Sequence, residues 1–99
     1  EFVDCKIRGS VYSSDFYGCD IEGSDIRMCA LFQGSDVKES KVQSCYVSES
    51  THLENCYVFG IDTYFEGQMQ GGIFREGRFT HKASFVETEI VQSKKIEQH

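Results

Sequence analysis

Large apolar residues recur along this chain about once every five residues. Nineteen positions carry the pattern: Phe2, Ile7, Val11, Phe16, Ile21, Ile26, Leu31, Val37, Val42, Val47, Leu53, Val58, Phe65, Met69, Ile73, Phe79, Phe85, Ile90 and Ile96. Eighteen of them have a residue two positions earlier, and in seventeen cases it is Cys, Ser, Gly, Thr or Ala. Residues two apart on an extended backbone face the same way. We therefore expect each small residue and the apolar residue after it to point into one interior.

Repetition of this kind marks stacked units that bury one continuous core. The spacing fits neither the helical period nor a two-residue alternation, and the many β-branched residues, serines and glycines disfavour helices. The sequence therefore predicts an all-β fold, a single parallel β-solenoid with short flat sides and a corner at each repeat. Residues 1–99 would form one domain, and we expect it to be a fragment of a longer protein because Glu1 and Phe2 enter in mid-repeat.

The repeated triplets, such as Cys5-Lys6-Ile7, Ser14-Asp15-Phe16 and Cys19-Asp20-Ile21, resemble the pentapeptide-repeat proteins. The resemblance is strong over residues 2–58 and weaker beyond them. Cys or Ser followed by Ile or Val replaces the family's usual Ala or Asn followed by Leu. The resemblance implies a right-handed parallel β-helix with four sides per coil and about five coils. Extra residues would then bulge at 34–36 and 60–62, where turn residues cluster.

A second resemblance lies in Tyr57-Val58-Phe59-Gly60 and in residues 71–77, which are similar to degenerate solenoid tails of uncharacterised tailed-phage proteins. It implies a phage-like structural domain and a cytoplasmic or virion-associated location. The sequence shows no signal-peptide pattern and no apolar run long enough to span a membrane. We therefore expect no membrane partner.

The chain carries a formal net charge of −6, and its ten Lys and Arg residues are scattered. Direct nucleic-acid binding needs a basic surface, so the composition argues against it. Some acidic pentapeptide-repeat proteins mimic duplex DNA and occupy DNA-binding enzymes, and the resemblance leaves such a DNA mimic as an alternative function. Lys6, Arg8, Lys38, Lys41 and Arg78 would interrupt a continuous acidic stripe.

All five cysteines, Cys5, Cys19, Cys29, Cys45 and Cys56, occupy the small inward position. On a four-sided register Cys5 and Cys45 share a face but lie two coils apart, about 9–10 Å. This separation exceeds the reach of a disulfide. No cysteine or histidine spacing suggests zinc. We expect buried free thiols, with no metal and no cofactor.

His52 and His81 are candidates for a catalytic base, because single-histidine catalysis occurs in hexapeptide-repeat acyltransferases. Those enzymes need a regular six-residue spacing, whereas only five of the eighteen spacings here are six. No nucleophile–base motif, paired carboxylates or phosphate loop is found. We therefore expect a non-enzymatic protein without catalytic residues or a small-molecule substrate, and an acyltransferase remains an alternative.

The residue after each apolar position should face outward, and aromatic residues occur there repeatedly. Five form the candidate interface: Tyr12, Tyr17, Phe32, Phe59 and Phe74. On the four-sided register they lie on two adjacent sides. Two interpretations remain open, which are aromatic stacking between coils and a contact surface. If these residues form a contact surface, we expect a homo-oligomer or a protein partner.

The coil ends are the other candidate for self-association. The last coil would present Phe85, Ile90 and Ile96 to solvent, and it has no obvious cap. Lys94, Lys95 and Glu97 could shield this edge with charge. We therefore expect the side wall to be the preferred interface.

Overall fold

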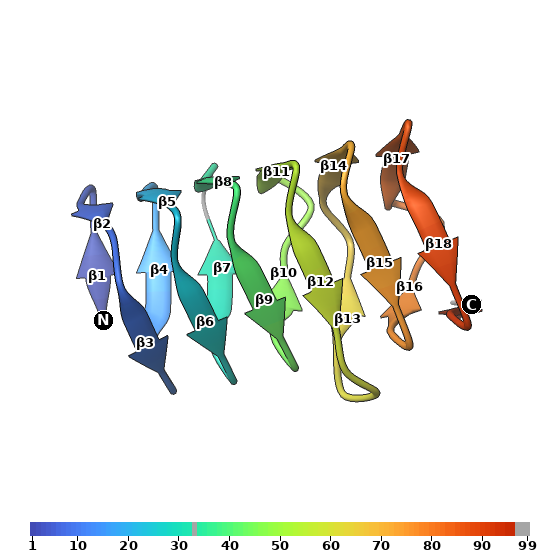
Figure 1. Cartoon of the computed structure of the whole chain (residues 1–99). Coiled ribbons are helices and arrows are strands. Elements are labelled where there is room, and N and C mark those ends of the chain that lie inside the picture. The colour runs from blue at the N-terminus through green and yellow to red at the C-terminus, as the bar shows by residue number, and fades with distance from the viewer. Residues whose placement is uncertain (33, 97–99) are drawn as a thin grey trace.

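The computed structural model describes residues 1–32 and 34–96, so Glu97, one of the residues predicted to shield the C-terminal edge, lies outside the described range. Over this range the chain forms no helix and winds into nineteen short strands, which pair in parallel within three sheets. The coils stack along one axis, with the N-terminus at one end and the C-terminus at the other (Figure 1). The predicted all-β parallel solenoid is confirmed.

Each sheet takes every third strand of the chain. Sheet A contains β1 (Phe2–Val3), β4 (Asp15–Tyr17), β7 (Ala30–Phe32), β10 (Tyr46–Val47), β13 (Tyr64–Phe65), β16 (Arg78–Phe79) and β19 (Lys94–Lys95). Sheet B contains β2 (Lys6–Ile7), β5 (Asp20–Glu22), β8 (Asp36–Lys38), β11 (His52–Glu54), β14 (Gln68–Gln70) and β17 (Ser84–Val86). Sheet C contains β3 (Ser10–Tyr12), β6 (Asp25–Arg27), β9 (Lys41–Gln43), β12 (Tyr57–Phe59), β15 (Ile73–Arg75) and β18 (Glu89–Val91).

The coils are right-handed. In Figure 1 the chain rises along sheet A at the back, crosses sheet B at the top and descends along sheet C at the front while it advances from left to right. Right-handed crossovers are the rule between parallel strands. The handedness implied by the family resemblance therefore holds.

Each coil has three sides, so the expectation of four sides is wrong. Ile21, Val37 and Leu53 are successive Cα partners, sixteen residues apart. The described residues consequently make about six turns rather than five. The repeat length sets the length of a side but not the angle of a corner, so the sequence spacing alone could not distinguish three sides from four.

Three inward columns fill the interior, one beneath each sheet. Beneath sheet A lie Phe2, Phe16, Leu31, Val47, Phe65 and Phe79. Beneath sheet B lie Ile7, Ile21, Val37, Leu53, Met69 and Phe85. Beneath sheet C lie Val11, Ile26, Val42, Val58, Phe74 and Ile90. The middle members are buried, whereas those of the first and last coils are partly exposed because only one neighbouring coil covers them.

The predicted inward position of Ile73 is wrong. Phe74 is the Cα partner of Val58 and is 0% exposed, whereas Ile73 is 36% exposed. The inward triplet is Gly72-Ile73-Phe74, and a Cβ on Gly72 would collide with the backbone of Cys56. Glycines at both 71 and 72 allowed either register in the sequence. Phe74 also cannot belong to an exposed interface, which corrects its assignment there.

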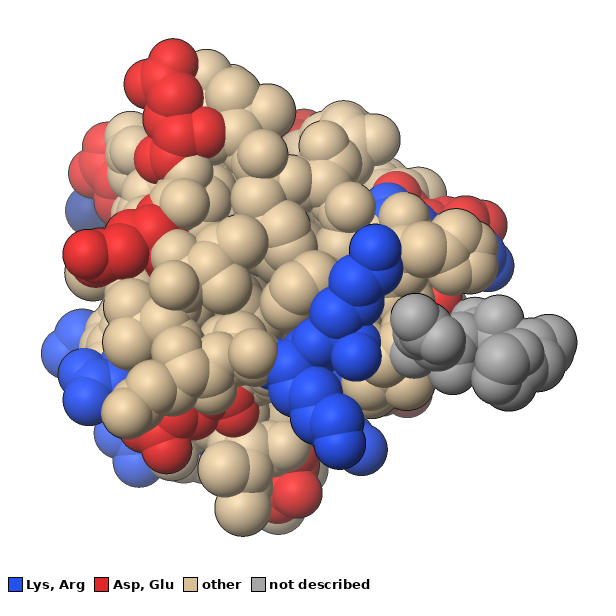
Figure 2. All heavy atoms as spheres, turned by 90° about the vertical axis from the view of Figure 1, so that its right-hand side faces the viewer, with Lys and Arg blue, Asp and Glu red and all other residues tan. Residues whose placement is uncertain are grey.

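Ile96 also lies off the predicted column, because Lys95 is the Cα partner of Phe79. Lysine at an inward position discourages a further coil from stacking there. Figure 2 looks onto this C-terminal end and shows a largely uncharged face crossed by basic side chains. Beneath this face, Phe74, Phe79 and Phe85 pack edge to face, with ring centroids 5.1 to 5.8 Å apart.

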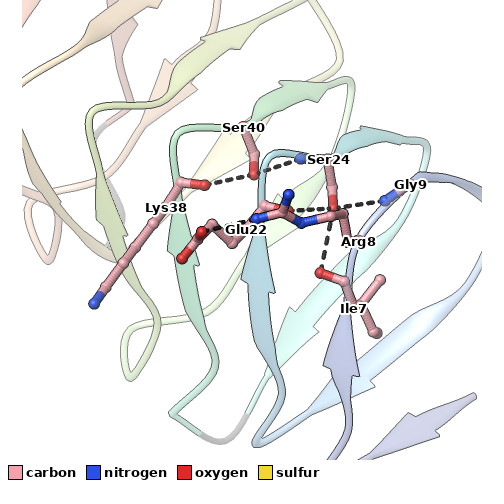
Figure 3. A network of polar contacts seen from close by, with 7 residues as sticks. All are labelled: Ile7, Arg8, Gly9, Glu22, Ser24, Lys38 and Ser40. Atoms are coloured by element: carbon pink, nitrogen blue, oxygen red, sulfur yellow. Dashed lines mark hydrogen bonds and ion pairs between the residues drawn. The ribbon is translucent and has the colours of Figure 1, made fainter.

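The small residues form hydrogen-bonded columns at the corners, as Figure 3 shows for one of them. Ser24 Oγ accepts the N–H of Gly9 at 3.2 Å, and Ser40 Oγ accepts the N–H of Ser24 at 3.0 Å. Ser40 Oγ also donates to the carbonyl oxygen of Lys38 at 2.8 Å. Thiols act in the same way, since Cys45 Sγ accepts the N–H of Cys29 at 3.4 Å. These small side chains therefore join their coils to the preceding ones.

Corners with extra residues use a different hydrogen bond. Thr51 N–H donates to the carbonyl oxygen of Ser48 at 3.1 Å, and Thr63 N–H donates to that of Gly60 at 3.0 Å. These bonds close local turns, so the corner N–H needs no side chain from the next coil. The bulge predicted at 60–62 is confirmed by the second of these turns.

The residue before the small one bends the chain. Nine non-glycine residues in the described ranges have φ between 47° and 55°: Asp4, Ser13, Met28, Glu39, Ser44, Asn55, Glu76, Glu87 and Gln92. The left-handed conformation costs a non-glycine residue about 1–2 kcal/mol. Core packing and corner hydrogen bonds must offset this cost at every coil.

A pair of neighbouring substitutions tests the corrected register. Phe74→Ala should lower the free energy of unfolding by about 3–5 kcal/mol, because it empties a packed aromatic site. Ile73→Ala should stay within about 0.5 kcal/mol of the parent, as expected for a surface position. Urea unfolding measures both. A larger loss of stability for Ile73→Ala than for Phe74→Ala would support the register in which Ile73 points inward.

The corner columns predict that hydrogen bonding, and not size alone, selects the small residue. Ser40→Ala should lower the free energy of unfolding by about 1–3 kcal/mol, because the buried N–H of Ser24 loses its acceptor. Ser40→Cys is the matched control and should lose less, since Cys45 already accepts such a bond. Equal urea midpoints for Ser40→Ala and the parent would contradict this role.

Candidate interaction surface

The aromatic residues outside sheet A form a ladder along the solenoid. Ring centroids lie 5.2 Å apart for Tyr17 and Phe32, 5.5 Å for Phe32 and Tyr46, and 5.6 Å for Tyr46 and Tyr64. Rings in this arrangement contact one another between coils. Tyr17 and Phe32, two of the five interface candidates, therefore serve coil-to-coil stacking.

A polar cluster continues from this ladder. Glu66 is only 8% exposed, and its two carboxylate oxygens accept hydrogen bonds from Tyr46 Oη at 3.3 Å and Thr80 Oγ1 at 3.2 Å. Burial raises the pKa of Tyr46, and the nearby carboxylate raises it further. The sequence pattern did not indicate this cluster, because these side chains come from three different coils. These hydrogen bonds connect three coils along sheet A. They occupy both carboxylate oxygens of Glu66, which leaves the cluster few polar groups to bind an external ligand.

Tyr12 and Phe59, the other two outward candidates, lie in one column outside sheet C. Tyr12 is 56% exposed, and the Arg27 guanidinium lies 5.5 Å from its ring centroid. Arg27 Nη2 also contacts Asp25 Oδ2 at 3.1 Å. Tyr12 is therefore set among charged side chains, at a distance of three coils from Phe59.

A partly exposed apolar patch surrounds Phe59, which is half-buried like Tyr57. Tyr57 and Phe59 stack across their own strand with ring centroids 4.5 Å apart, and Ile73 is the Cα partner of Tyr57. Ile61 follows in the turn and is 72% exposed. We call Tyr57, Phe59, Ile61 and Ile73 the sheet C apolar patch. Only Phe59 was among the candidates, since the sequence register had placed Ile73 inside.

The outer face of sheet B is polar. Arg8 Nη2 contacts Glu22 Oε1 at 2.9 Å, and Glu22, Lys38 and Glu54 are successive Cα partners. The sign of the charge therefore alternates along this column, whereas Asp20 and Asp36 are Cα partners of like charge in the other outward column. Two open hollows follow this face, and His52 lines one of them.

His52 and His81 lie at separate places on the solenoid. His81 is exposed in the turn before β17, whereas His52 is on sheet B, between Asp36 and Gln68 in register. Across residues 1–32 and 34–96, no group of three or more His, Cys, Asp or Glu side chains could hold a metal ion.

The cysteines occupy different corners from those expected. Cys5 and Cys19 share the corner before sheet B, Cys29 and Cys45 share the corner before sheet A, and Cys56 precedes sheet C. Members of each pair are thus one coil apart, about 4.8 Å, so the predicted separation of two coils between cysteines on one face is wrong. All five are nevertheless free, and all except Cys5 are buried.

Burial controls the chemistry of the inner thiols. It raises the pKa of Cys45 to about 12 and also raises the pKa values of Cys29 and Cys56. The thiolate is the reactive form of cysteine. These thiols therefore pack and donate hydrogen bonds rather than act as nucleophiles.

Comparison with known proteins provides no family. No protein-family model matches the chain, and no curated protein matches it significantly. In the part of the chain that the structure describes, no helix is long and apolar enough to cross a membrane. The best-supported candidate site is the sheet C apolar patch, because of its stacked rings and the neighbouring exposed isoleucine.

The raised pKa of Cys45 predicts a loss of stability at alkaline pH. The unfolded thiol ionises near pH 8.5, whereas the folded thiol stays protonated up to a pKa of about 12. The contribution of Cys45 is therefore fully present below pH about 8.5 and declines as the pH rises. Cys45→Ser should show a shallower decline in the free energy of unfolding above that pH. Parallel curves for parent and variant would contradict the shift.

Proposed function

We propose that this protein is a non-enzymatic structural and interaction module that self-associates through the sheet C apolar patch. The observation that carries the proposal is β12, where both outward residues, Tyr57 and Phe59, are aromatic. Ile73 extends the apolar surface to the next strand. Contiguous apolar surface on a soluble protein is typical of a contact site.

The surroundings of the patch support an interface. Lys41 and Gln43 are the Cα partners of Tyr57 and Phe59 on one side, and Glu89 is the partner of Ile73 on the other. An apolar centre with a polar rim is the usual anatomy of a protein interface. The stacked coils also hold these side chains on a regular sheet, which reduces the ordering cost of binding.

DNA mimicry has less support. The net charge of −6 favours it, but Arg8 and Lys38 alternate with Glu22 and Glu54 on sheet B. A mimic of duplex DNA needs a regular acidic array without interleaved cations. The relationship to pentapeptide-repeat proteins likewise remains a proposal supported by the repeat, while the three-sided coil departs from the family's shape.

The proposal predicts concentration-dependent association that depends on Ile73. Ile73→Glu places a charge in the patch and should weaken association at least about tenfold. Val86→Glu is the matched control, because Val86 is exposed on sheet B away from the patch. Sedimentation equilibrium measures both variants. A parent protein that stays monomeric at all concentrations would contradict self-association. Equal effects of the two substitutions on association would exclude the sheet C apolar patch as the interface.

A further inference from the structure

The outer face of sheet C is complementary to itself. One outward column runs through Lys41, Tyr57, Ile73 and Glu89 on β9, β12, β15 and β18. The first and last residues have opposite charge, and the two between them are apolar. If a second copy covers this face with its strands in the reverse order, each charged residue lies opposite a charge of the other sign, and each apolar residue lies opposite an apolar residue.

We propose that two copies pack sheet C against sheet C about a two-fold axis parallel to the strands, midway between β12 and β15. The proposal rests on the self-association proposed above and adds the partner and its register. Such an axis reverses the order of the coils and keeps each outward column opposite its own copy. Lys41 then faces Glu89 of the second copy, and Tyr57 faces Ile73 of the second copy.

The second outward column fits the same axis. It contains Gln43, Phe59, Arg75 and Val91. Reversal places the Phe59 ring opposite Arg75 of the second copy, and a guanidinium over an aromatic ring is attractive. Because the axis is two-fold, each of these contacts occurs twice.

The charges select this axis over the other two-fold arrangement of the same faces. An axis along the solenoid would place Lys41 opposite Gln43 and Glu89 opposite Val91 of the second copy, so neither charge would gain a counterion across the interface. Within its own chain, Lys41 is the Cα partner of Asp25, which contacts Arg27. Among the described residues, the ion pairs involve neither Lys41 nor Glu89. Both are exposed and available to a second copy.

The size of the sheet C face determines the affinity that we expect for the dimer. The molecule measures 32 × 26 × 21 Å, so a single side offers a small interface. Interfaces burying less than about 1,200 Å² in total are typical of weak or transient complexes. We therefore expect a reversible dimer, whose opposite charges fix the register more than they add affinity.

A charge-reversal series tests the register. Lys41→Glu and Glu89→Lys each create two like-charge contacts in the dimer, and each should weaken dimerisation about three- to tenfold at low salt. The double variant, Lys41→Glu with Glu89→Lys, restores opposite charges and should return to within about twofold of the parent. Lys38→Glu makes the same charge change on sheet B and should leave dimerisation unchanged. Sedimentation equilibrium over a concentration series measures each constant, and circular dichroism checks folding.

The outcomes separate the register from the function. A dimer that all single reversals leave unchanged, or that the double variant fails to restore, overturns the two-fold register while self-association stands. A parent that is monomeric throughout overturns both proposals. Recovery in the double variant, with no effect of Lys38→Glu, supports the pairing of Lys41 with Glu89.

Discussion

At several tight corners in the described part of the solenoid, a backbone N–H points along the axis, where no strand partner is available. A small hydroxyl or thiol from the next coil accepts this hydrogen, as Ser40 does for Ser24 and Cys45 does for Cys29. Buried N–H groups without partners are costly. This requirement explains why the same position must be small enough to fit the corner and, in most coils, able to accept a hydrogen bond.

The rest of the architecture follows from these columns. Because each corner is tied to the corner of the next coil, the strands stay in register, and the apolar residue two positions later stacks on its counterpart. The strands of two or three residues contribute few ladder bonds of their own, so no coil is stable alone and the stack stabilises them together. The phenylalanine cluster and Lys95 then close the C-terminal end.

With the interior fixed, the outward positions are free to differ among the three sides. Sheet A places aromatic rings in contact between coils, and sheet B carries charges of both signs. Sheet C instead has two rings that stack within one strand, beside an exposed isoleucine. Its aromatic surface is therefore less occupied by neighbouring coils, which makes this side the best-supported contact surface.

The sequence by itself determined the parallel β-solenoid and nearly all of its inward residues, because the small and apolar positions must face one interior wherever the chain is extended. It could not determine three sides rather than four, since spacing carries no information about the corner angle set by left-handed residues such as Met28 and Asn55. It also left Ile73 and Phe74 ambiguous, because a glycine lies two positions before each. Only packing decided between them, since the ring of Phe74 fills the space among Phe65, Phe79 and Phe85. That choice turned Ile73 outward and created the apolar patch of sheet C.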